Sequence, residues 1–246
     1  MPGKILECLT WKEAEAVLKE ETLIVIPLGA AAKEHGYHLQ LRNDWLIAEY
    51  LKTRLIIEED LLALPTLNYS YYPAFVEYPG SISLSKETAR NMIIEICRSI
   101  AAFGPKRFYV LNTGISTLEI LEQAALNLLE EKIVLHYTNM DKALADLKKE
   151  ISEQEGGSHA DEIETSMLLY IAPESVQMQN AKRDYIKDAP GRLSRRPDTP
   201  FSYSESGVWG DATLASRSKG EKIVECLFKQ ILEEIEALRK VPVLKD

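Results

Sequence analysis

The chain has few cysteines and no long apolar run. Its 246 residues include three cysteines, which are far apart, odd in number and not part of a Cys-x-x-Cys pair: Cys8, Cys97 and Cys226. We expect buried, reduced thiols, the state typical of a reducing compartment. The longest apolar runs, such as residues 23–28, fall far short of the ~20 residues of a membrane-spanning helix, and the first residues lack an apolar stretch of signal-peptide length. These absences predict a soluble, cytoplasmic protein without a membrane partner.

Positive charge and several common catalytic signatures are also missing. The 38 acidic residues outnumber the 29 basic ones and give a formal net charge of −9, which argues against a nucleic-acid partner because phosphate backbones attract basic surfaces. The sequence contains no G-x-G-x-x-G, no Walker A loop, no G-x-S-x-G elbow and no H-E-x-x-H. Standard dinucleotide-binding, P-loop, serine-hydrolase and zincin sites are therefore not indicated.

Apolar periodicity and turn residues predict alternating strands and helices. We expect strands at 23–29, 61–67, 107–112 and 132–138. We expect helices at 10–21, 44–58, 85–104, 116–131, 141–152, 161–170 and 214–239, with capping boxes at Thr10 and Ser116 and a cap at Ser85. Strands separated by helices predict an α/β fold, in which a mostly parallel central sheet is covered on both faces as three α/β/α layers. We expect one domain, residues 1–246, with an irregular segment at 172–210.

The strongest chemical signal follows the first of these strands. Lys33-Glu34-His35-Gly36-Tyr37-His38 is followed by Asp44. Two imidazoles and two carboxylates within eleven residues are typical of a divalent-metal site. The alternative is a histidine-rich surface loop in which Asp44 only caps the next helix.

Two further segments carry polar groups that could join this loop. The first, His159 to Ser166, brings one histidine and three carboxylates to a helix start, where acidic residues also favour the helix dipole. His159 and Glu164 are five residues apart, so they converge only if His159 precedes the helix. The second is residues 207–211 (GVWGD), and by itself this segment is better explained as a turn before the final helix. Because ligands of parallel sheets bind at the carboxyl ends of the strands, we predict that 30–44, 112–116, 159–164 and 207–211 meet there.

Taken together, the segments IPLGAAAKEHGYHLQLRND, VLNTG, HADEIETSMLLYIAPESV and GVWGDATLASRSKGE resemble the creatininase (creatinine amidohydrolase) family. This resemblance implies a creatininase-like α/β/α fold and a homo-oligomer, often a ring-like hexamer. It also implies hydrolysis of C–N bonds in small or cyclic amides, or of a formamide, with two divalent ions, usually zinc with manganese or iron.

Carried over residue by residue, the resemblance implies an incomplete two-metal site. His35 and Asp44 match metal ligands, and His38 matches the second histidine of the first motif. The family's leading Glu ligand falls on Lys33 and the histidine ligand of the second motif on Gly114. The position that supplies a Glu ligand in creatinine-hydrolysing members is Ser116.

The remaining matches imply at most one ion. His35, Asp44 and Glu164 could hold one divalent metal, zinc first and manganese or iron as alternatives, with His159 or His38 as general acid–base. The primary hypothesis is therefore a one-metal amidohydrolase acting on a small molecule. The alternative is a catalytically degenerate member that binds a ligand or serves in an assembly. A third hypothesis is a different chemistry in which Lys33 acts as a base or nucleophile.

The charge balance of this site leads to one more prediction. Without two of its ligands, the first metal position would leave Asp44 as an uncompensated carboxylate, which is costly in a desolvated pocket. We expect the Lys33 ammonium to occupy that position and pair with Asp44, in the room that Gly114 leaves. The alternative is that Lys33 points into solvent. We also expect residues 172–210 to contribute to oligomer contacts or to a neighbouring site.

Overall fold

The computed structural model describes residues 2–188 and 193–242. Its centre is a sheet of order β1-β3-β2-β4-β5 in which every neighbouring pair is parallel. The strands are β1 (Lys4–Ile5), β2 (Leu23–Leu28), β3 (Leu62–Ala63), β4 (Arg107–Asn112) and β5 (Val134–Tyr137). The two long strands, β2 and β4, lie side by side in the middle, and all of β2 is buried. Burial on both faces explains why LIVIPL is continuously apolar rather than alternating.

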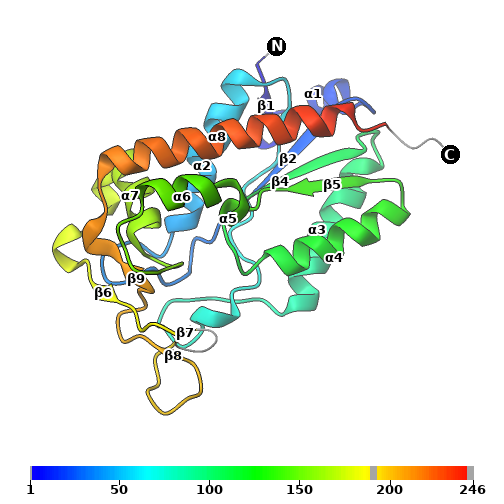
Figure 1. Cartoon of the computed structure of the whole chain (residues 1–246). Coiled ribbons are helices and arrows are strands. Elements are labelled where there is room, and N and C mark those ends of the chain that lie inside the picture. The colour runs from blue at the N-terminus through cyan, green and yellow to red at the C-terminus, as the bar shows by residue number, and fades with distance from the viewer. Residues whose placement is uncertain (1, 189–192, 243–246) are drawn as a thin grey trace.

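Helices cover both faces of this sheet, so the predicted three-layer arrangement is confirmed (Figure 1). The helices are α1 (Trp11–Val17), α2 (Asn43–Glu58), α3 (Lys86–Ala101), α4 (Leu118–Glu130), α5 (Met140–Ala143), α6 (Ala145–Ile151), α7 (Glu162–Ile171) and α8 (Arg217–Lys240). Alternate residues of β2 face opposite layers, since Val25 packs with α2, α7 and α8, whereas Ile24 and Ile26 pack with α3 and α4.

The start of α2 is held against the carboxyl ends of β2 and β4. Gly29 directly follows β2, and a Cβ at this position would overlap the backbone of Asp44. The Thr113 hydroxyl, just after β4, donates to the carbonyl oxygens of both Leu28 and Asp44 at 3.1 and 2.9 Å. The ends of the two central strands thus fix the first turn of α2, and with it the Asp44 carboxylate.

Several predicted boundaries were wrong, for local reasons. Helix α1 ends at Val17 rather than 21, although its capping box at Thr10 is confirmed. The capping box predicted at Ser116 is absent, because Thr117 takes the N-cap position and its hydroxyl instead donates to Asn112 Oδ1 and the Gly114 carbonyl at 2.6 and 2.8 Å. The 141–152 helix is two helices that meet at Leu144.

Other differences concern the edges of the sheet and the thiols. β1 was not predicted, and β3 is two residues long, with a single bridge from Leu28 to Leu67 beyond it. α8 begins at Arg217, after a 3-10 turn at Ala212–Leu214. Cys97 is buried as expected, but Cys8 is exposed and Cys226 half-buried. Of the described helices, none is both long and apolar enough to cross a bilayer.

Short paired strands organise the described part of segment 172–210. β6 (Arg183–Asp184) pairs antiparallel with β9 (Gly210–Asp211), and β7 (Leu193–Ser194) pairs parallel with β8 (Ser202–Tyr203). They lie at the lower left of Figure 1, away from α1. The segment is otherwise irregular, as predicted, and it borders the site described below.

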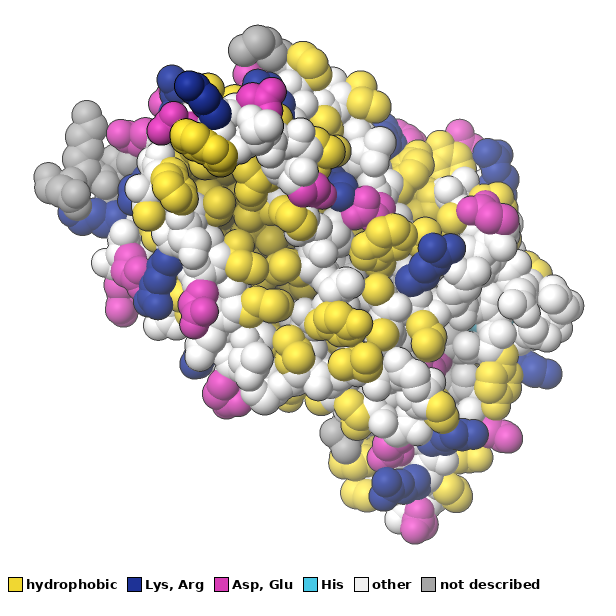
Figure 2. Space-filling model, turned by 180° about the vertical axis from the view of Figure 1, so that it is seen from behind, with side chains coloured by type: hydrophobic (Ala, Val, Ile, Leu, Met, Phe, Trp, Pro, Cys, Tyr) yellow, Lys and Arg dark blue, Asp and Glu magenta, His cyan; other side chains and the backbone are white. Residues whose placement is uncertain are grey.

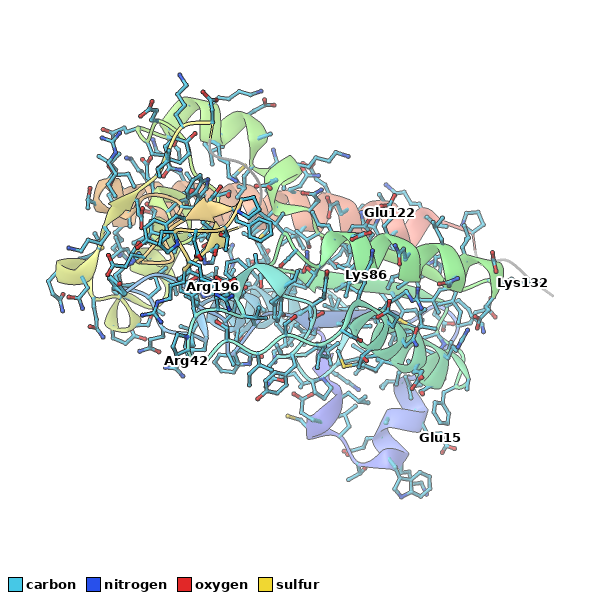
Figure 3. The ribbon with its side chains drawn as sticks, turned by 90° about the horizontal axis from the view of Figure 1, so that it is seen from below. Glu15, Arg42, Lys86, Glu122, Lys132 and Arg196 are labelled. Carbon is cyan, nitrogen blue, oxygen red and sulfur yellow. The ribbon has the colours of Figure 1, made fainter. Side chains whose placement is uncertain are left out.

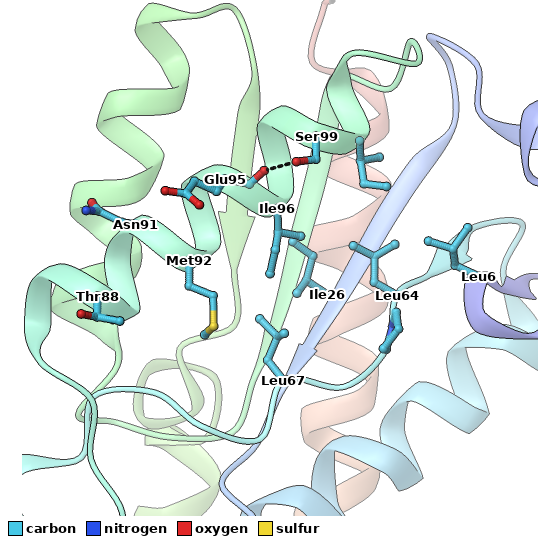
Figure 4. A pocket seen from close by; sticks show the side chains of 12 residues that line it. Leu6, Ile26, Leu64, Leu67, Thr88, Asn91, Met92, Glu95, Ile96 and Ser99 are labelled. Carbon is cyan, nitrogen blue, oxygen red and sulfur yellow. Dashed lines mark hydrogen bonds between the residues drawn. The ribbon is translucent and has the colours of Figure 1, made fainter. Parts of the chain in front are cut away.

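One apolar groove lies beside α3, on the layer opposite α2. It encloses about 800 Å³, and the labelled Leu64, Leu67, Met92 and Ile96 line it (Figure 4). Figure 2 shows hydrophobic side chains gathered in a hollow on the back face of the molecule. In Figure 3 the labelled Glu15 lies on α1, which projects from the side of the molecule.

Candidate metal and catalytic site

The four segments predicted to converge do meet at the carboxyl ends of β2 and β4. Mutual backbone hydrogen bonds join His159 to Trp209, which brings segments 159–164 and 207–211 together. The rings of His35 and His159 then lie with their centroids 4.9 Å apart. A Cβ at Gly114 would lie 3.9 Å from Asp44 Oδ2, so segment 112–116 borders the same place.

Lys33 and Asp44 form a buried ion pair. Lys33 Nζ lies 2.6 Å from Asp44 Oδ2, and the two side chains are 4% and 1% exposed. Burial alone would raise the pKa of Asp44, but the Lys33 ammonium, with His35, holds that pKa well below its ordinary value. The predicted pairing is confirmed, and the alternative of a solvent-facing Lys33 is wrong. Asp44 lies in the first turn of α2, whose N-cap is Arg42, so it is not simply a helix cap.

His35 is placed between two oxygen acceptors. Its Nδ1 lies 2.9 Å from the Lys33 carbonyl and its Nε2 2.8 Å from Asp44 Oδ1. A neutral imidazole carries one N–H, so with Nδ1–H donating to the carbonyl, the Nε2 lone pair would face a carboxylate oxygen. A cation shared by Nε2 and Asp44, either a proton or a metal ion, removes that repulsion. The tautomer with Nδ1–H donating to the carbonyl is the one that a metal-binding histidine needs, and the contact with the Lys33 carbonyl is compatible with it.

His159 has the matching arrangement on the other side of the cluster. Its Nε2 contacts the backbone carbonyl and the Oε2 of Glu34, at 2.9 and 3.1 Å, and its Nδ1 lies 3.7 Å from Glu164 Oε2. Burial by itself would lower the pKa of His159, but the Glu34 carboxylate, helped by Glu164, raises it above the ordinary value. As required for convergence, His159 precedes α7, whose N-cap is Asp161.

Glu34 and Glu164 are themselves anchored by the backbone. Glu34 accepts the Gly36 N–H, and Glu164 Oε2 accepts the Ala160 N–H at 2.7 Å. A Cβ at Gly207 would overlap the Glu34 carboxylate, and Gly207 has a φ of +80°. Sequence reasoning missed Glu34 as the partner of His159. Glu34 lies beside Gly207, so the first and last motifs are in contact. Residue spacing within a single segment cannot predict such a contact.

His38 lies apart from the cavity-facing groups. Its Nε2 is 2.7 Å from the Thr165 hydroxyl, and Nδ1 has no hydrogen-bond partner among the described residues. Burial, reinforced by the nearby His35, lowers the pKa of His38 to about 4. His38 is therefore neutral at physiological pH.

The donor set suits one divalent ion. One donor atom from each of His35, His159 and Glu164 lies within 4.8 Å of the other two. Ligands ~2.1 Å from a tetrahedral zinc ion lie ~3.4 Å from one another, so modest closure of this group would complete the geometry. Asp44 reaches the cluster through its contact with His35. The neighbouring position, bordered by Lys33, Asp44 and Gly114, does not suit a second ion, because an ammonium already faces the carboxylate there.

A cavity of about 230 Å³ opens onto this cluster. Phe75 and Leu193, which the motifs did not indicate, form part of its wall with Trp209 of the GVWGD motif. Polar groups of the site complete the wall: Lys33, Ser116, His159 and Glu164. Tyr72, from the tyrosine-rich loop, is buried beside Lys33, and its hydroxyl has no hydrogen-bond partner in the described part of the chain. At ~30 Å³ per water in the liquid, the cavity is the size of about eight waters, which suits a small ligand.

Comparison with known proteins agrees with this geometry. A family model described as creatininase, creatinine amidohydrolase, matches residues 7–235. The chain therefore belongs to the creatininase family.

Two curated relatives and one solved structure illustrate the range of the family. The chain is 28% identical to a creatinine amidohydrolase of Pseudomonas putida, across 92% of this chain and 94% of that protein. It is 26% identical to a mycofactocin precursor peptide peptidase of Mycobacterium tuberculosis, across 86% and 84%. A solved structure described as creatininase Mn superposes with a TM-score of 0.80 at 22% identity, covering 97% of this chain and all of that one. The similarity to this solved structure supports the assignment of the fold.

Proposed function

We propose that this protein hydrolyses the C–N bond of a small or cyclic amide with at most one divalent ion. The observation that carries the proposal is the buried Lys33–Asp44 pair at 2.6 Å beside a group of two histidines and a carboxylate. Relatives named as an amidohydrolase and a peptidase both cleave C–N bonds, which supports the reaction class.

In this proposal His35, Asp44 and Glu164 hold the ion, with His159 adjacent. Imidazole and carboxylate donors suit zinc, and manganese or iron are the alternatives. An ion bound there would supply a lowered pKa for a coordinated water at neutral pH. With Nδ1–H donating to the Lys33 carbonyl, His35 would have its Nε2 free for the ion.

His159 is the better placed of the two predicted acid–base groups. It lines the cavity, and Glu34 raises its pKa, so it can carry a proton toward a leaving nitrogen. His38 is buried and does not line the cavity, and its Nε2 lies 2.7 Å from the Thr165 hydroxyl. Because its pKa is lowered to about 4, it is the weaker base, and in our proposal His159 alone takes the acid–base role.

A catalytically inactive binding protein is the second candidate. The observation that favours it is that Lys33 neutralises Asp44 without any metal ion. Such a protein would retain the cavity and bind a small ligand without turnover.

An activity screen separates the two candidates. The full chain, purified without chelator and then supplied with zinc, manganese or iron(II), is assayed on creatinine, other cyclic amides and formamides. We expect metal-dependent release of amine and acid, abolished in His159→Asn and Glu164→Gln. His136→Asn, at an exposed histidine of β5, is the matched control and should keep full activity. Absence of hydrolysis across the screen, together with saturable ligand binding, would favour the inactive binding protein.

A further inference from the structure

We propose that the Lys33 ammonium binds the reacting oxygen of the ligand: the carbonyl oxygen of an amide substrate and the carboxylate of its product. This inference rests on the proposed function, because it takes the cavity beside the histidine cluster as the substrate site. It makes Lys33 a catalytic residue and defines the ligand class as a small molecule with an amide or carboxylate oxygen.

The first argument is the number of donors on Lys33. An ammonium group carries three N–H donors, and Asp44 is the single hydrogen-bonding or ion-pairing partner of Nζ within residues 2–188 and 193–242. Only 4% of the Lys33 side chain is exposed, so 96% of it is buried. A buried ammonium whose other N–H groups have no partner binds an oxygen acceptor strongly, because these N–H groups are shielded from water and an unsatisfied buried donor is costly.

The second argument is where those donors can point. The Nζ atom lies 4.9 Å from the centroid of the Phe75 ring and 5.6 Å from that of Tyr72. The faces of these two rings offer the ammonium no oxygen acceptor, and the Tyr72 hydroxyl has no hydrogen-bond partner among the described residues. Lys33 also lines the cavity of about 230 Å³ that His159 and Glu164 share. A ligand oxygen in that cavity would meet the Lys33 donors on one side and the proposed water-activating group on the other.

The third argument is that Asp44 keeps the position of Lys33 fixed. Asp44 Oδ2 lies 2.6 Å from Lys33 Nζ, and the Thr113 hydroxyl donates a hydrogen bond to the Asp44 carbonyl oxygen at 2.9 Å, which holds the Asp44 backbone in place. A preorganised donor of this kind stabilises negative charge as it develops, with little reorganisation.

Such a donor fits a balanced hydrolysis. The oxygen of water forms a bond to the carbonyl carbon, and the C=O π electrons move onto the carbonyl oxygen, which the Lys33 N–H groups stabilise as an anion. When those electrons return, the C–N bond breaks and its electron pair goes to nitrogen, which takes the proton that the water gave up. The products are an amine and an acid, and Lys33 keeps all three of its protons.

Acetate, as a minimal carboxylate product, provides a direct binding test. Acetate is titrated by calorimetry into the full chain, with and without added zinc, and into Lys33→Met, Lys33→Arg and Lys52→Met. Lys52 is the matched control: it is a buried lysine on α2, paired with Glu49 at 2.7 Å. A charge-assisted hydrogen bond contributes ~1.5–3 kcal/mol, so Lys33→Met should weaken acetate binding by roughly 10–100-fold. Lys33→Arg should retain most of the affinity, and Lys52→Met all of it.

Because Lys33→Met leaves Asp44 unpaired, circular dichroism checks its fold, and the double variant Lys33→Met with Asp44→Asn provides a neutral replacement if the single variant is unfolded. Wild-type affinity in a folded Lys33→Met or in the double variant, or no saturable acetate binding by the wild type, overturns the inference. Lys33-dependent acetate binding in a protein that hydrolyses no amide would overturn the proposed function alone. Hydrolysis with kcat unchanged in Lys33→Met would overturn this inference alone.

Discussion

At the scale of single residues, the buried Lys33–Asp44 pair is the observation that supports our proposal of a site with at most one ion. Lys33→Ala strands a buried carboxylate, and we expect it to lower the free energy of unfolding by ~1–3 kcal/mol, the cost of leaving a buried group unsatisfied. Urea unfolding followed by circular dichroism measures the change. Lys149→Ala removes an exposed ion pair with Asp146, 77% and 98% exposed, and should change stability by less than ~0.5 kcal/mol. Equal effects of the two substitutions would contradict a structural role for the buried pair.

Restoring two ligands should restore a second ion. Lys33→Glu with Gly114→His puts a carboxylate and an imidazole on either side of Asp44, and a Cβ at position 114 already faces Asp44 Oδ2 at 3.9 Å. We expect the double variant to bind about one more divalent ion per chain, because these are ligand types that such a site needs. Elemental analysis by mass spectrometry measures it. Gly114→His alone is the control and should add none, since the ammonium would remain.

Sequence reasoning identified Lys33, Asp44 and Gly114 because they stand at fixed positions in quoted motifs. It could not identify the partner of His159, because Glu34 reaches that ring only when residues 207–211 lie against the first loop. That contact depends on tertiary packing between segments more than a hundred residues apart.

At the scale of secondary-structure elements, α7 and α8 approach so closely that a glycine is needed between them. A Cβ on Gly220 would overlap the carbonyl oxygen of Ser166. A glycine-to-alanine change in a helix normally stabilises by ~0.5–1 kcal/mol, but overpacking costs ~1–3 kcal/mol. We therefore expect Gly220→Ala to destabilise the protein in thermal unfolding. Lys222→Ala, on the exposed side of the same helix, should be nearly neutral, and a stabilised Gly220→Ala would show that the two helices are not packed this closely.

Sequence patterns predicted the helices and strands that are long enough to show an apolar pattern, and they missed or misjudged the short ones. β2 and β4 have six residues each, and α2, α3 and α8 have 16, 16 and 24, so each offers a pattern long enough to be recognised in the sequence. β1 and β3 are two residues each, so their strand character comes from pairing with neighbours rather than from any local pattern. The Ser116 cap failed for a related reason, because Asn112, at the end of β4, takes the Thr117 hydroxyl.

At the scale of the whole molecule, we predict a homo-oligomer. The described part of segment 172–210 carries only two-residue strands and two three-residue 3-10 helices. The groove beside α3 adds an apolar surface of the kind that oligomers bury. Light scattering at micromolar concentration should give a mass several times the 27.8 kDa of the chain, and the family resemblance implies a hexamer. A single monomeric species would contradict this prediction.

The central claim is that the site holds one divalent ion at most, because an ammonium occupies the place of a second. The most direct test is the metal content of the full chain, expressed and purified without chelator and supplied with zinc. We predict about one ion per chain, which His35→Ala should abolish and Lys52→Met should leave unchanged. Two ions per chain in the wild-type protein would contradict the claim, and none would leave the inactive binding protein as the account of this site.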